Sequence, residues 1–275
     1  MLTSVLSVAP LRISFVGGGT DIPEFYKESK GSVVSCAIQK YVYVHVKIHD
    51  KSFQEKYRIS YSEVEHSNER SKIKNTIVKA CLEFLDIDFP LQISTSSDLP
   101  AGSGLGSSSS FTTSLLLALH ALRGEKISSY ELADEACKVE MDILGKPIGK
   151  QDQFSASFGG INLFNFLSSG QVEIYPIKIQ QDLAEDFMAR CCLFWTGKNR
   201  SADEILANQV KNIPRKYYEL EKMAILAQNL SKTFESKSLK WNEIAAIINQ
   251  GWEIKMNLNS TILNNEIREI GRAHV

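Results

Sequence analysis

The chain has 275 residues, a formal net charge of -1, and an ordinary globular composition with 43% hydrophobic and 23% charged residues. It is long enough to bury a core without disulfides, and it has no overall basic field that would hold nucleic acid or an anionic membrane. Its five cysteines are odd in number and lack C-x-x-C spacing, which argues against a disulfide framework and a thiolate zinc site. We therefore expect a reduced, cytoplasmic location, with no signal peptide and no membrane span.

The first part of the chain predicts strands followed by helices. A short apolar strand over residues 12–16 stops at three glycines, and strict alternation predicts a half-buried strand over 41–48. Helical spacing of apolar residues predicts a helix over 71–85, and residues 91–95 return to an extended pattern. Apolar residues recur at helical spacing from Phe111 onward, so a buried helix follows the Gly/Ser segment directly.

The second part of the chain begins with a helix start signal. Ser128 and Glu131 form a capping-box pattern, and the helix that they open is expected to run to about Leu144. Three strand-like runs follow, at residues 161–166, 172–177 and 190–196. The remainder from Ser201 is mostly helical in pattern. Because strands precede long helices without regular βαβ alternation, the predicted fold class is α+β.

Residues 100–110, PAGSGLGSSSS, have the composition of a phosphate-binding loop. A glycine-rich turn that feeds a helix N-terminus offers free N–H groups and a favourable dipole. The segment lacks the lysine of a Walker A loop, and its glycine spacing does not fit a dinucleotide βαβ unit. A flexible linker and a run of helix-capping serines are the alternatives, although capping does not require three glycines in five positions.

Two carboxylates downstream are candidates for chemistry. Glu140 lies four residues after Ala136, close to the apolar face of the capped helix, where a carboxylate is costly unless it is paired or bound to metal. It could also be a boundary residue that reaches solvent. Asp152 starts a helical segment after Pro147, where the helix dipole alone could explain it. A phosphate cradle, a metal-holding acid and a carboxylate base would suffice for phosphoryl transfer.

The N-terminal segment RISFVGGGTD at residues 12–21 joins a strand to a second glycine-rich loop. Taken alone, Arg12 could be a surface ion-pair residue at the end of a strand, and Asp21 could cap a helix that begins at Ile22.

Together with DLPAGSGLGSSSS at 98–110, PIGKQDQ at 147–153 and WTGKNRSA at 195–202, this segment resembles the motifs of the GHMP kinases. The sequences of these motifs are most similar to those of the D-glycero-D-manno-heptose 7-phosphate kinases, followed by those of fucokinase-like sugar kinases. The resemblance covers essentially the whole chain. It implies a two-lobed α+β fold, in which the N-terminal lobe is like domain 2 of ribosomal protein S5 and the α+β C-terminal lobe is incomplete.

The resemblance also implies an activity and roles for residues. The γ-phosphate of ATP would pass, with Mg²⁺, to the anomeric 1-hydroxyl of the heptose 7-phosphate. Asp152 would accept or orient the proton of that hydroxyl, Arg12 would lie beside the acceptor, and Ser108 and Glu140 would hold Mg²⁺. The ATP phosphates would lie against Pro100, Gly102, Ser103, Gly104, Leu105, Gly106, Ser107, Ser108 and Ser109.

The acceptor would be met by Gly18, Gly19, Thr20, Asp21, Lys150, Gln151, Thr196 and Arg200. Arg200 is favoured for the phosphate of the acceptor because a guanidinium grips phosphate bidentately, with Lys150 and Lys198 as further candidates. Each of these cations could instead be a solvated surface charge. The expected partners are therefore a small sugar phosphate and ATP, without nucleic acid or membrane, and the oligomeric state stays open.

Other interpretations are another GHMP sugar kinase, fucokinase-like or for a hexosamine, and a non-catalytic sugar or nucleotide sensor of the same fold.

We expect an ATP-binding lobe over residues 1–167 and a partial second lobe over 168–268. Residues 269–275 read like a translated sequencing adapter, and we expect them to be an artefact. The third glycine-rich motif of the family is not found, so we expect a truncated protein of poor activity.

Overall fold

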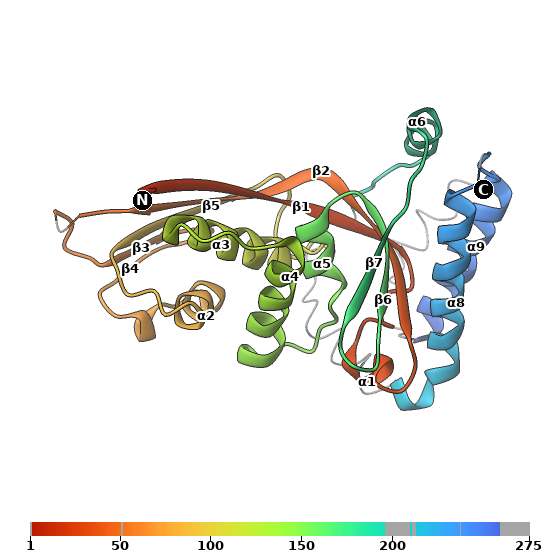
Figure 1. The fold of residues 1–275 in the computed structure, drawn as a ribbon, viewed down its shortest axis with the longest axis horizontal. Coiled ribbons are helices and arrows are strands. Elements are labelled where there is room, and N and C mark those ends of the chain that lie inside the picture. The colour runs from red at the N-terminus through yellow and green to blue at the C-terminus, as the bar shows by residue number, and fades with distance from the viewer. Residues whose placement is uncertain (1, 51, 196–209, 211–212, 237, 259–275) are drawn as a thin grey trace. The chain divides into compact units, whose positions relative to one another are not determined.

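The computed structural model describes residues 2–50, 52–195, 210, 213–236 and 238–258. The chain forms two compact units that exchange segments along the sequence. Unit 1 comprises Met1–Arg12, Ala37–Lys146 and Asp152–Gly159, and unit 2 comprises Ile13–Cys36, Pro147–Gln151 and Gly160–Val275. The long strands β1 (Ser4–Val16) and β2 (Gly31–Ile48) contribute to both units, as Figure 1 lets the reader follow.

Unit 1 is a mixed sheet with helices on one face. The second half of β2 pairs antiparallel with β5 (Leu91–Ser97), β5 pairs parallel with β3 (Tyr57–Ser60), and β3 pairs antiparallel with β4 (Val64–Ser67). Its helices are the 3-10 turn η1 (Arg70–Lys72), α2 (Thr76–Phe84), α3 (Ser107–Arg123), α4 (Ser129–Cys137), the π-helical segment η2 (Lys138–Ile143) and α5 (Gln151–Phe158).

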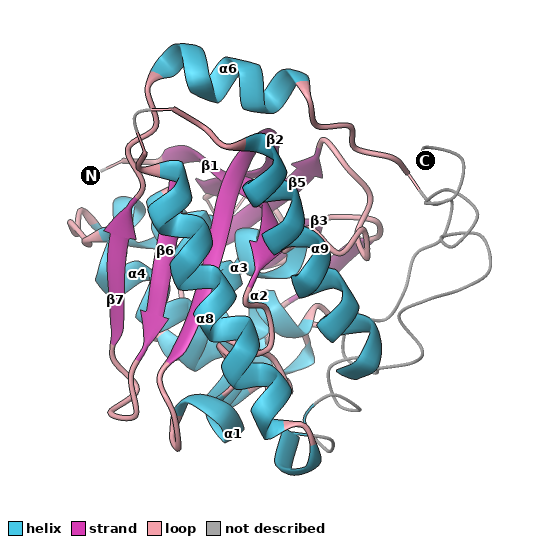
Figure 2. Ribbon diagram, turned by 90° about the vertical axis from the view of Figure 1, so that its right-hand side faces the viewer, coloured by secondary structure: helices cyan, strands magenta, loops and turns pink. Residues whose placement is uncertain are grey.

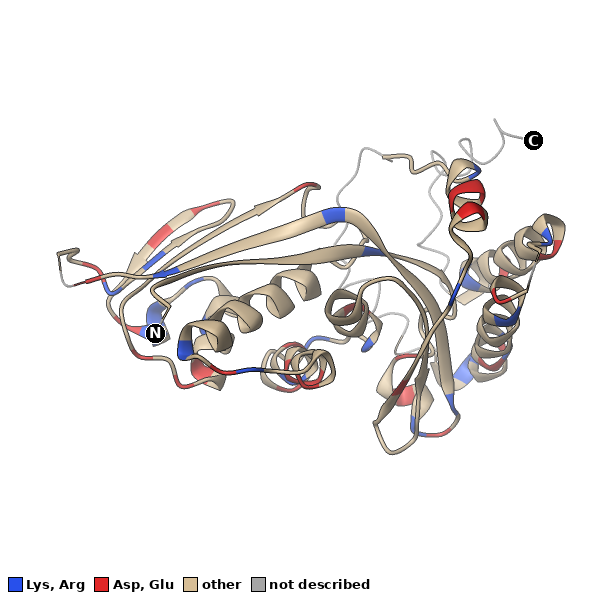
Figure 3. Ribbon diagram, turned by 45° about the horizontal axis from the view of Figure 1, so that its top comes forward, with Lys and Arg blue, Asp and Glu red and all other residues tan. Residues whose placement is uncertain are grey.

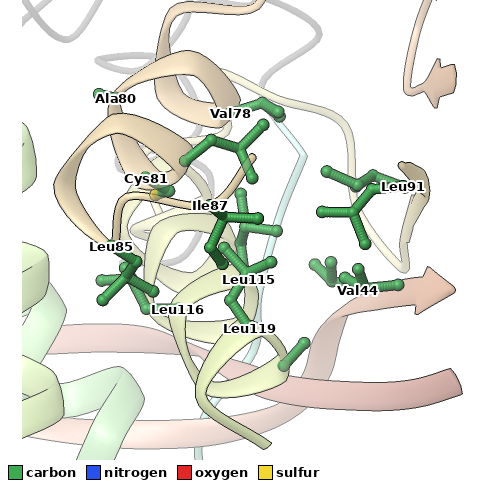
Figure 4. Close-up of a cluster of buried hydrophobic side chains, with 14 of the residues drawn as sticks. Val44, Val78, Ala80, Cys81, Leu85, Ile87, Leu91, Leu115, Leu116 and Leu119 are labelled. Carbon is green, nitrogen blue, oxygen red and sulfur yellow. The ribbon is translucent and has the colours of Figure 1, made fainter. Parts of the chain in front are cut away.

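The core of unit 1 lies between these strands and helices (Figure 4). The alternation over 41–48 is realised in β2, where Val42, Val44 and Val46 are buried. They belong to the same apolar cluster as Leu115 and Leu119 of α3. Successive residues of a strand point to opposite faces, so the valines all face the helices, and the predicted half-buried strand is confirmed.

In unit 2, long helices cover strands that continue the seven-stranded sheet from the first half of β2. The first half of β2 pairs antiparallel with β6 (Ile161–Phe166), and β6 pairs antiparallel with β7 (Val172–Pro176). The helices α8 (Tyr217–Phe234) and α9 (Trp241–Leu258) lie over one face of these strands (Figure 2). The helices of unit 2 are α1 (Pro23–Tyr26), α6 (Gln181–Ala189), the 3-10 turn η3 (Ile213–Arg215), α8 (Tyr217–Phe234) and α9 (Trp241–Leu258).

The α+β class is confirmed, as is the capping box, in which the Ser128 side chain accepts the Glu131 N–H and the Glu131 side chain accepts the Ser128 N–H. The helix expected over 71–85 is shorter, because the Asn75 side chain accepts from the N–H of Val78 and starts α2 at Thr76.

The strand predicted at 190–196 is wrong over the residues that are described. α6 ends at Ala189, and residues 191–195 form no regular element. The apolar run has the composition of a strand, but a strand also needs a neighbour to complete its hydrogen bonds, and none pairs with it among the described residues.

The expected lobe boundary near 167–171 stays a prediction. These residues form the turn between β6 and β7, where the Leu167 N–H donates to the Gln171 carbonyl. Residues 269–275 lie outside the described residues.

Basic and acidic residues are interspersed along the drawn elements (Figure 3), and no described helix combines the length and apolar character of a membrane span.

Candidate active site

The glycine-serine segment is an ordered turn that leads into α3. Gly102, Gly104 and Gly106 all adopt positive φ angles, of 76°, 77° and 79°, a region that glycine enters without steric cost. Gly106 is the N-cap of α3, and no side chain caps the helix. The interpretation of the serines as helix caps is therefore wrong, and the first N–H groups of α3 are left without a side-chain acceptor.

The serines of this segment differ in their exposure to solvent. Ser108 is exposed, whereas Ser109 and Ser110 are buried, and the Ser110 hydroxyl donates to the Pro10 carbonyl at 2.7 Å. Ser103 Oγ is buried and has no hydrogen-bond partner among the described residues. A buried hydroxyl without a partner is costly, so Ser103 is a position where a ligand oxygen would be stabilising.

Arg12 connects this turn to Asp152. Its Nε and one terminal nitrogen donate to the two carboxylate oxygens of Asp152 at 2.7 and 2.8 Å, and its other terminal nitrogen donates to the Gly104 carbonyl at 2.8 Å. The side chains of Arg12 and Asp152 are only 12% and 23% exposed. Arg12 also lies inside β1 and not at its end, so the surface ion-pair interpretation is wrong. The bidentate geometry fixes the orientation of the Asp152 carboxylate.

Gly106 lies directly against this ion pair. A Cβ atom added there would come within 3.3 Å of Asp152 Oδ2 and 3.4 Å of Arg12 Cγ. The glycine therefore lets the turn approach the Arg12–Asp152 pair closely, which a larger residue would prevent.

Glu140 is fully buried in a cluster of polar side chains. Its Oε1 accepts from the Ser108 hydroxyl at 2.7 Å and from the Lys146 ammonium at 2.9 Å, and its Oε2 accepts from the Gln153 amide at 2.8 Å. It lies in the π-helical segment η2, a geometry that occurs frequently at functional sites. The interpretation of Glu140 as a boundary residue that reaches solvent is wrong, and Ser108 and Glu140 are in direct contact.

The surroundings of Glu140 limit what kind of metal could bind. Burial, with the charge of Glu140 as the second cause, raises the pKa of the Cys81 thiol well above its usual range, so Cys81 is a protonated thiol and a poor ligand. Within the described part of the chain, no group of three or more His, Cys, Asp and Glu side chains could hold a metal ion. The remaining ligands of a cation at Ser108 and Glu140 would be water or phosphate oxygens, which is the manner in which Mg²⁺ binds.

The first glycine loop, residues 17–21 in unit 2, is organised by Asp21. This side chain is buried, and its carboxylate accepts from the N–H groups of Gly19 at 2.8 Å and Gln151 at 3.2 Å. The N-cap of α1 is Ile22 without a side-chain cap, so the helix-cap interpretation of Asp21 is wrong. Thr20 is also buried, and its hydroxyl bonds the N–H and carbonyl of Ser32. The hydrogen bonds of these two buried side chains therefore stabilise the conformation of the loop.

Two polar groups lie beside the outer part of this loop. The Lys255 ammonium of α9 donates to the Gly18 carbonyl at 3.0 Å. A Cβ atom added to Gly18 would lie 3.5 Å from the amide nitrogen of Gln151 and 3.8 Å from the Lys255 ammonium. Gln151 Oε1 is buried and has no partner among the described residues. Gly18, Gln151 and Lys255 therefore form a polar cluster in which Gln151 Oε1 could accept a hydrogen bond from a ligand.

Lys150 is the expected partner of the acceptor phosphate that lies among the described residues. The Lys150 ammonium donates to the Gly170 carbonyl at 2.7 Å and lies 5.7 Å from the centre of the Tyr26 ring, so its position is set by the protein. Thr196, Lys198 and Arg200 lie outside the described residues.

Sequence reasoning missed Lys146, Gln153 and Lys255. Lys146 directly precedes the PIGKQDQ motif and Gln153 is its last residue, so their place in the sequence was an available signal. Lys255 is separated from Gly18 by 237 positions, and nothing in the local sequence marks it.

Comparison with known proteins places these features in a family context. Residues 74–160 match the family described as GHMP kinases N terminal domain. The chain is 28% identical over 282 residues to the D-glycero-alpha-D-manno-heptose 7-phosphate kinase of Campylobacter jejuni, covering 98% of this chain and 82% of that protein. It is also 27% identical over 178 residues to the galactokinase of Thermotoga maritima, covering 62% of this chain and 49% of that enzyme.

Solved structures share the fold. A D-glycero-D-manno-heptose 1-phosphate kinase from Bacteriodes thetaiotaomicron aligns with a TM-score of 0.78 at 24% identity, over 91% of this chain and 78% of that one. Mevalonate kinase of L. major, in complex with R-mevalonate, aligns with a TM-score of 0.66 at 15% identity, over 93% of this chain and 77% of that one.

Proposed function

We propose that this chain, whose residues 74–160 are a GHMP kinase N-terminal domain, is an ATP-dependent sugar kinase that acts on a heptose phosphate. The observation that carries the proposal is the connection made by Arg12. One guanidinium holds the Asp152 carboxylate through two bonds and the glycine turn through a third. A group that could orient an attacking hydroxyl is thereby tied to a turn that could bind the phosphates of the donor.

We assign the donor phosphates to the turn at 102–106 and the start of α3. Three glycines with positive φ, the uncapped helix N-terminus and the unpartnered Ser103 hydroxyl support this assignment. Arg12 adds a positive charge beside the turn. Phosphoryl transfer depends mainly on positioning and charge neutralisation, so these groups are sufficient without a covalent intermediate.

We assign Mg²⁺ to the Ser108 and Glu140 oxygens. Their donor set fits a hard cation, since both offer oxygen and a buried carboxylate requires a positive partner. A bound Mg²⁺ would neutralise charge on the phosphate that is transferred. In this scheme the Gln153 side-chain amide donates to Oε2 of Glu140 and holds the carboxylate in place.

We assign binding of the acceptor sugar to the first glycine loop and proton transfer from its hydroxyl to Asp152, each on the motif that contains it. Asp152 directly follows Gln151, whose N–H donates to the Asp21 carboxylate of that loop. Asp152 would accept or orient the hydroxyl proton while Arg12 keeps it in place. Lys255 joins Arg200, Lys150 and Lys198 as a candidate for the phosphate of the acceptor.

The finer proposal is transfer to the anomeric 1-hydroxyl of D-glycero-D-manno-heptose 7-phosphate. It is supported by the motifs and by similarity to a heptose 7-phosphate kinase over almost all of this chain. The test is an assay of ADP release with Mg·ATP and a panel of heptose and hexose phosphates and free sugars, with the phosphorylated position assigned by NMR. Preference for fucose or a hexosamine would replace the heptose assignment, and ATP binding without any transfer would favour a sensor.

The role of Asp152 can be tested separately. Asp152→Asn keeps the size of the side chain but removes its basicity, so transfer should fall by about 10³-fold while ATP affinity stays within about threefold. Asp142→Asn, an exposed position on η2, is the matched control and should leave both unchanged. Undiminished transfer by Asp152→Asn would remove Asp152 from the mechanism.

A further inference from the structure

Lys146 occupies a distinctive position between the two residues that we assign to the metal. Its ammonium lies 2.7 Å from Ser108 Oγ and 2.9 Å from Glu140 Oε1, and these two oxygens are themselves 2.7 Å apart. The three groups form a closed triangle in which Ser108 donates to Glu140 and accepts from Lys146. The Lys146 side chain is 19% exposed, whereas Glu140 is not exposed at all.

The backbone reinforces this arrangement. The Lys146 N–H donates to the Glu140 carbonyl at 3.0 Å, so the segment after η2 turns back over Glu140. Lys146 thus contacts Glu140 twice: its ammonium donates to the carboxylate, and its N–H donates to the backbone carbonyl. A carboxylate without solvent contact requires such a compensating charge.

The triangle has nearly the dimensions that a metal site requires. Two neighbouring oxygens in an octahedral Mg²⁺ shell lie about 2.9 Å apart, because each is about 2.05 Å from the ion. The observed separation of Ser108 Oγ and Glu140 Oε1 is 2.7 Å. The ammonium, however, uses the same two oxygens, and two cations cannot share them at these distances without strong repulsion.

We propose that Lys146 is a positioning residue that holds Ser108 and Glu140 in their metal-binding arrangement and is displaced from both oxygens by the divalent cation. This inference rests on the proposed function, because it takes Ser108 and Glu140 as the metal-holding pair. Its partial exposure gives the Lys146 ammonium a path away from the carboxylate. The lysine therefore stabilises the ligand-free site and competes with the metal.

Cation binding tests the competition directly. In Lys146→Met the ammonium is lost while an unbranched side chain, one atom shorter, remains. This variant should bind Mn²⁺, measured by electron paramagnetic resonance of the full chain without nucleotide, about tenfold more tightly than the unsubstituted protein. Lys146→Arg keeps the positive charge and should bind Mn²⁺ like the unsubstituted protein.

Thermal unfolding tests the stabilising part. In EDTA, Lys146→Met should melt about 5 °C lower than the unsubstituted protein, because Glu140 is left buried without its cation, and excess MgCl₂ should restore most of the difference. Lys138→Met is the matched control. That lysine is 51% exposed and pairs with Asp134 one turn away, so neither measurement should change.

An unchanged or weaker Mn²⁺ affinity in Lys146→Met overturns the inference, and so does a loss of stability that MgCl₂ does not restore. Absence of Mn²⁺ binding by both proteins also overturns it, because a buried carboxylate freed of its ammonium should take up a cation. The proposed function fails on a different result, which is the absence of transfer to every sugar in the acceptor panel by the unsubstituted protein.

Discussion

The two glycine-rich loops have a similar composition, but their glycines serve different physical purposes. In the first loop, a Cβ atom on Gly17 would collide with the backbone of Ser32 and Val33. In the second loop, a Cβ atom on Gly104 would meet nothing within 4 Å. The glycine of the first loop is required by packing inside the protein, whereas that of the second loop leaves open space beside an uncapped helix.

The difference shows that a cluster of glycines does not by itself indicate a ligand. The first loop is closed by the protein: Asp21 fills the space that a side chain at Gly149 would need, and Thr20 does the same at Gly31. In the second loop, a Cβ atom on Gly106 would lie against the Arg12 and Asp152 side chains. Substitutions to alanine should therefore affect stability in the first loop and activity in the second.

The largest effect is expected for Gly17→Ala. The added methyl group would overlap backbone atoms at a φ of 103°, so the free energy of unfolding should fall by at least about 3 kcal/mol. Urea denaturation measures this loss. Gly160→Ala, with a φ of 65° and no atom within 4 Å of the added carbon, isolates the backbone cost and should lose only about 1 kcal/mol. Equal losses in the two variants would contradict the packing argument.

An intermediate effect is expected for Gly106→Ala. The added carbon would press on Asp152 and Arg12, so kcat should fall about tenfold as the ion pair shifts by a few tenths of an ångström. Steady-state kinetics with saturating ATP measure this change. The comparison is Gly124→Ala at the other end of α3, which has a similar φ of 75° and open space. If both variants keep full kcat, Gly106 has no role in positioning Asp152.

The smallest effect is expected for Gly104→Ala. Stability should fall by about 1 kcal/mol from the positive φ alone, while the KM for ATP should rise about fivefold because the methyl group points into the space assigned to the phosphates. Gly124→Ala should lose similar stability with no change in KM. An unchanged KM for Gly104→Ala would place the nucleotide elsewhere.

Local chemistry explains which predictions from sequence succeeded. The capping box at Ser128, the valine alternation in β2 and the helix after the Gly/Ser segment depend on residues close together in the chain, and all three are confirmed. The Ser108 hydroxyl donates to Glu140 across 32 positions, and the metal-holding role that the resemblance implies for both residues stays a prediction.

Predictions that needed a distant partner were less successful. The apolar residues at 191–195 resemble a strand, but the sequence does not say whether another strand lies beside them. Arg12 was interpretable as a surface residue until its partner Asp152, 140 positions away, was known. In both cases the side chain was compatible with two environments, and the neighbour decided between them.

The sequence by itself determined that this chain has a glycine turn before a buried helix, a carboxylate on an apolar helix face and a second carboxylate at a helix start, because these depend on residue type and spacing. Only the tertiary structure decided which groups pair with those carboxylates. Arg12, Lys146 and Gln153 were selected by the packing of strands and helices, since a charge removed from water is stabilised by whichever group the fold brings within hydrogen-bonding distance.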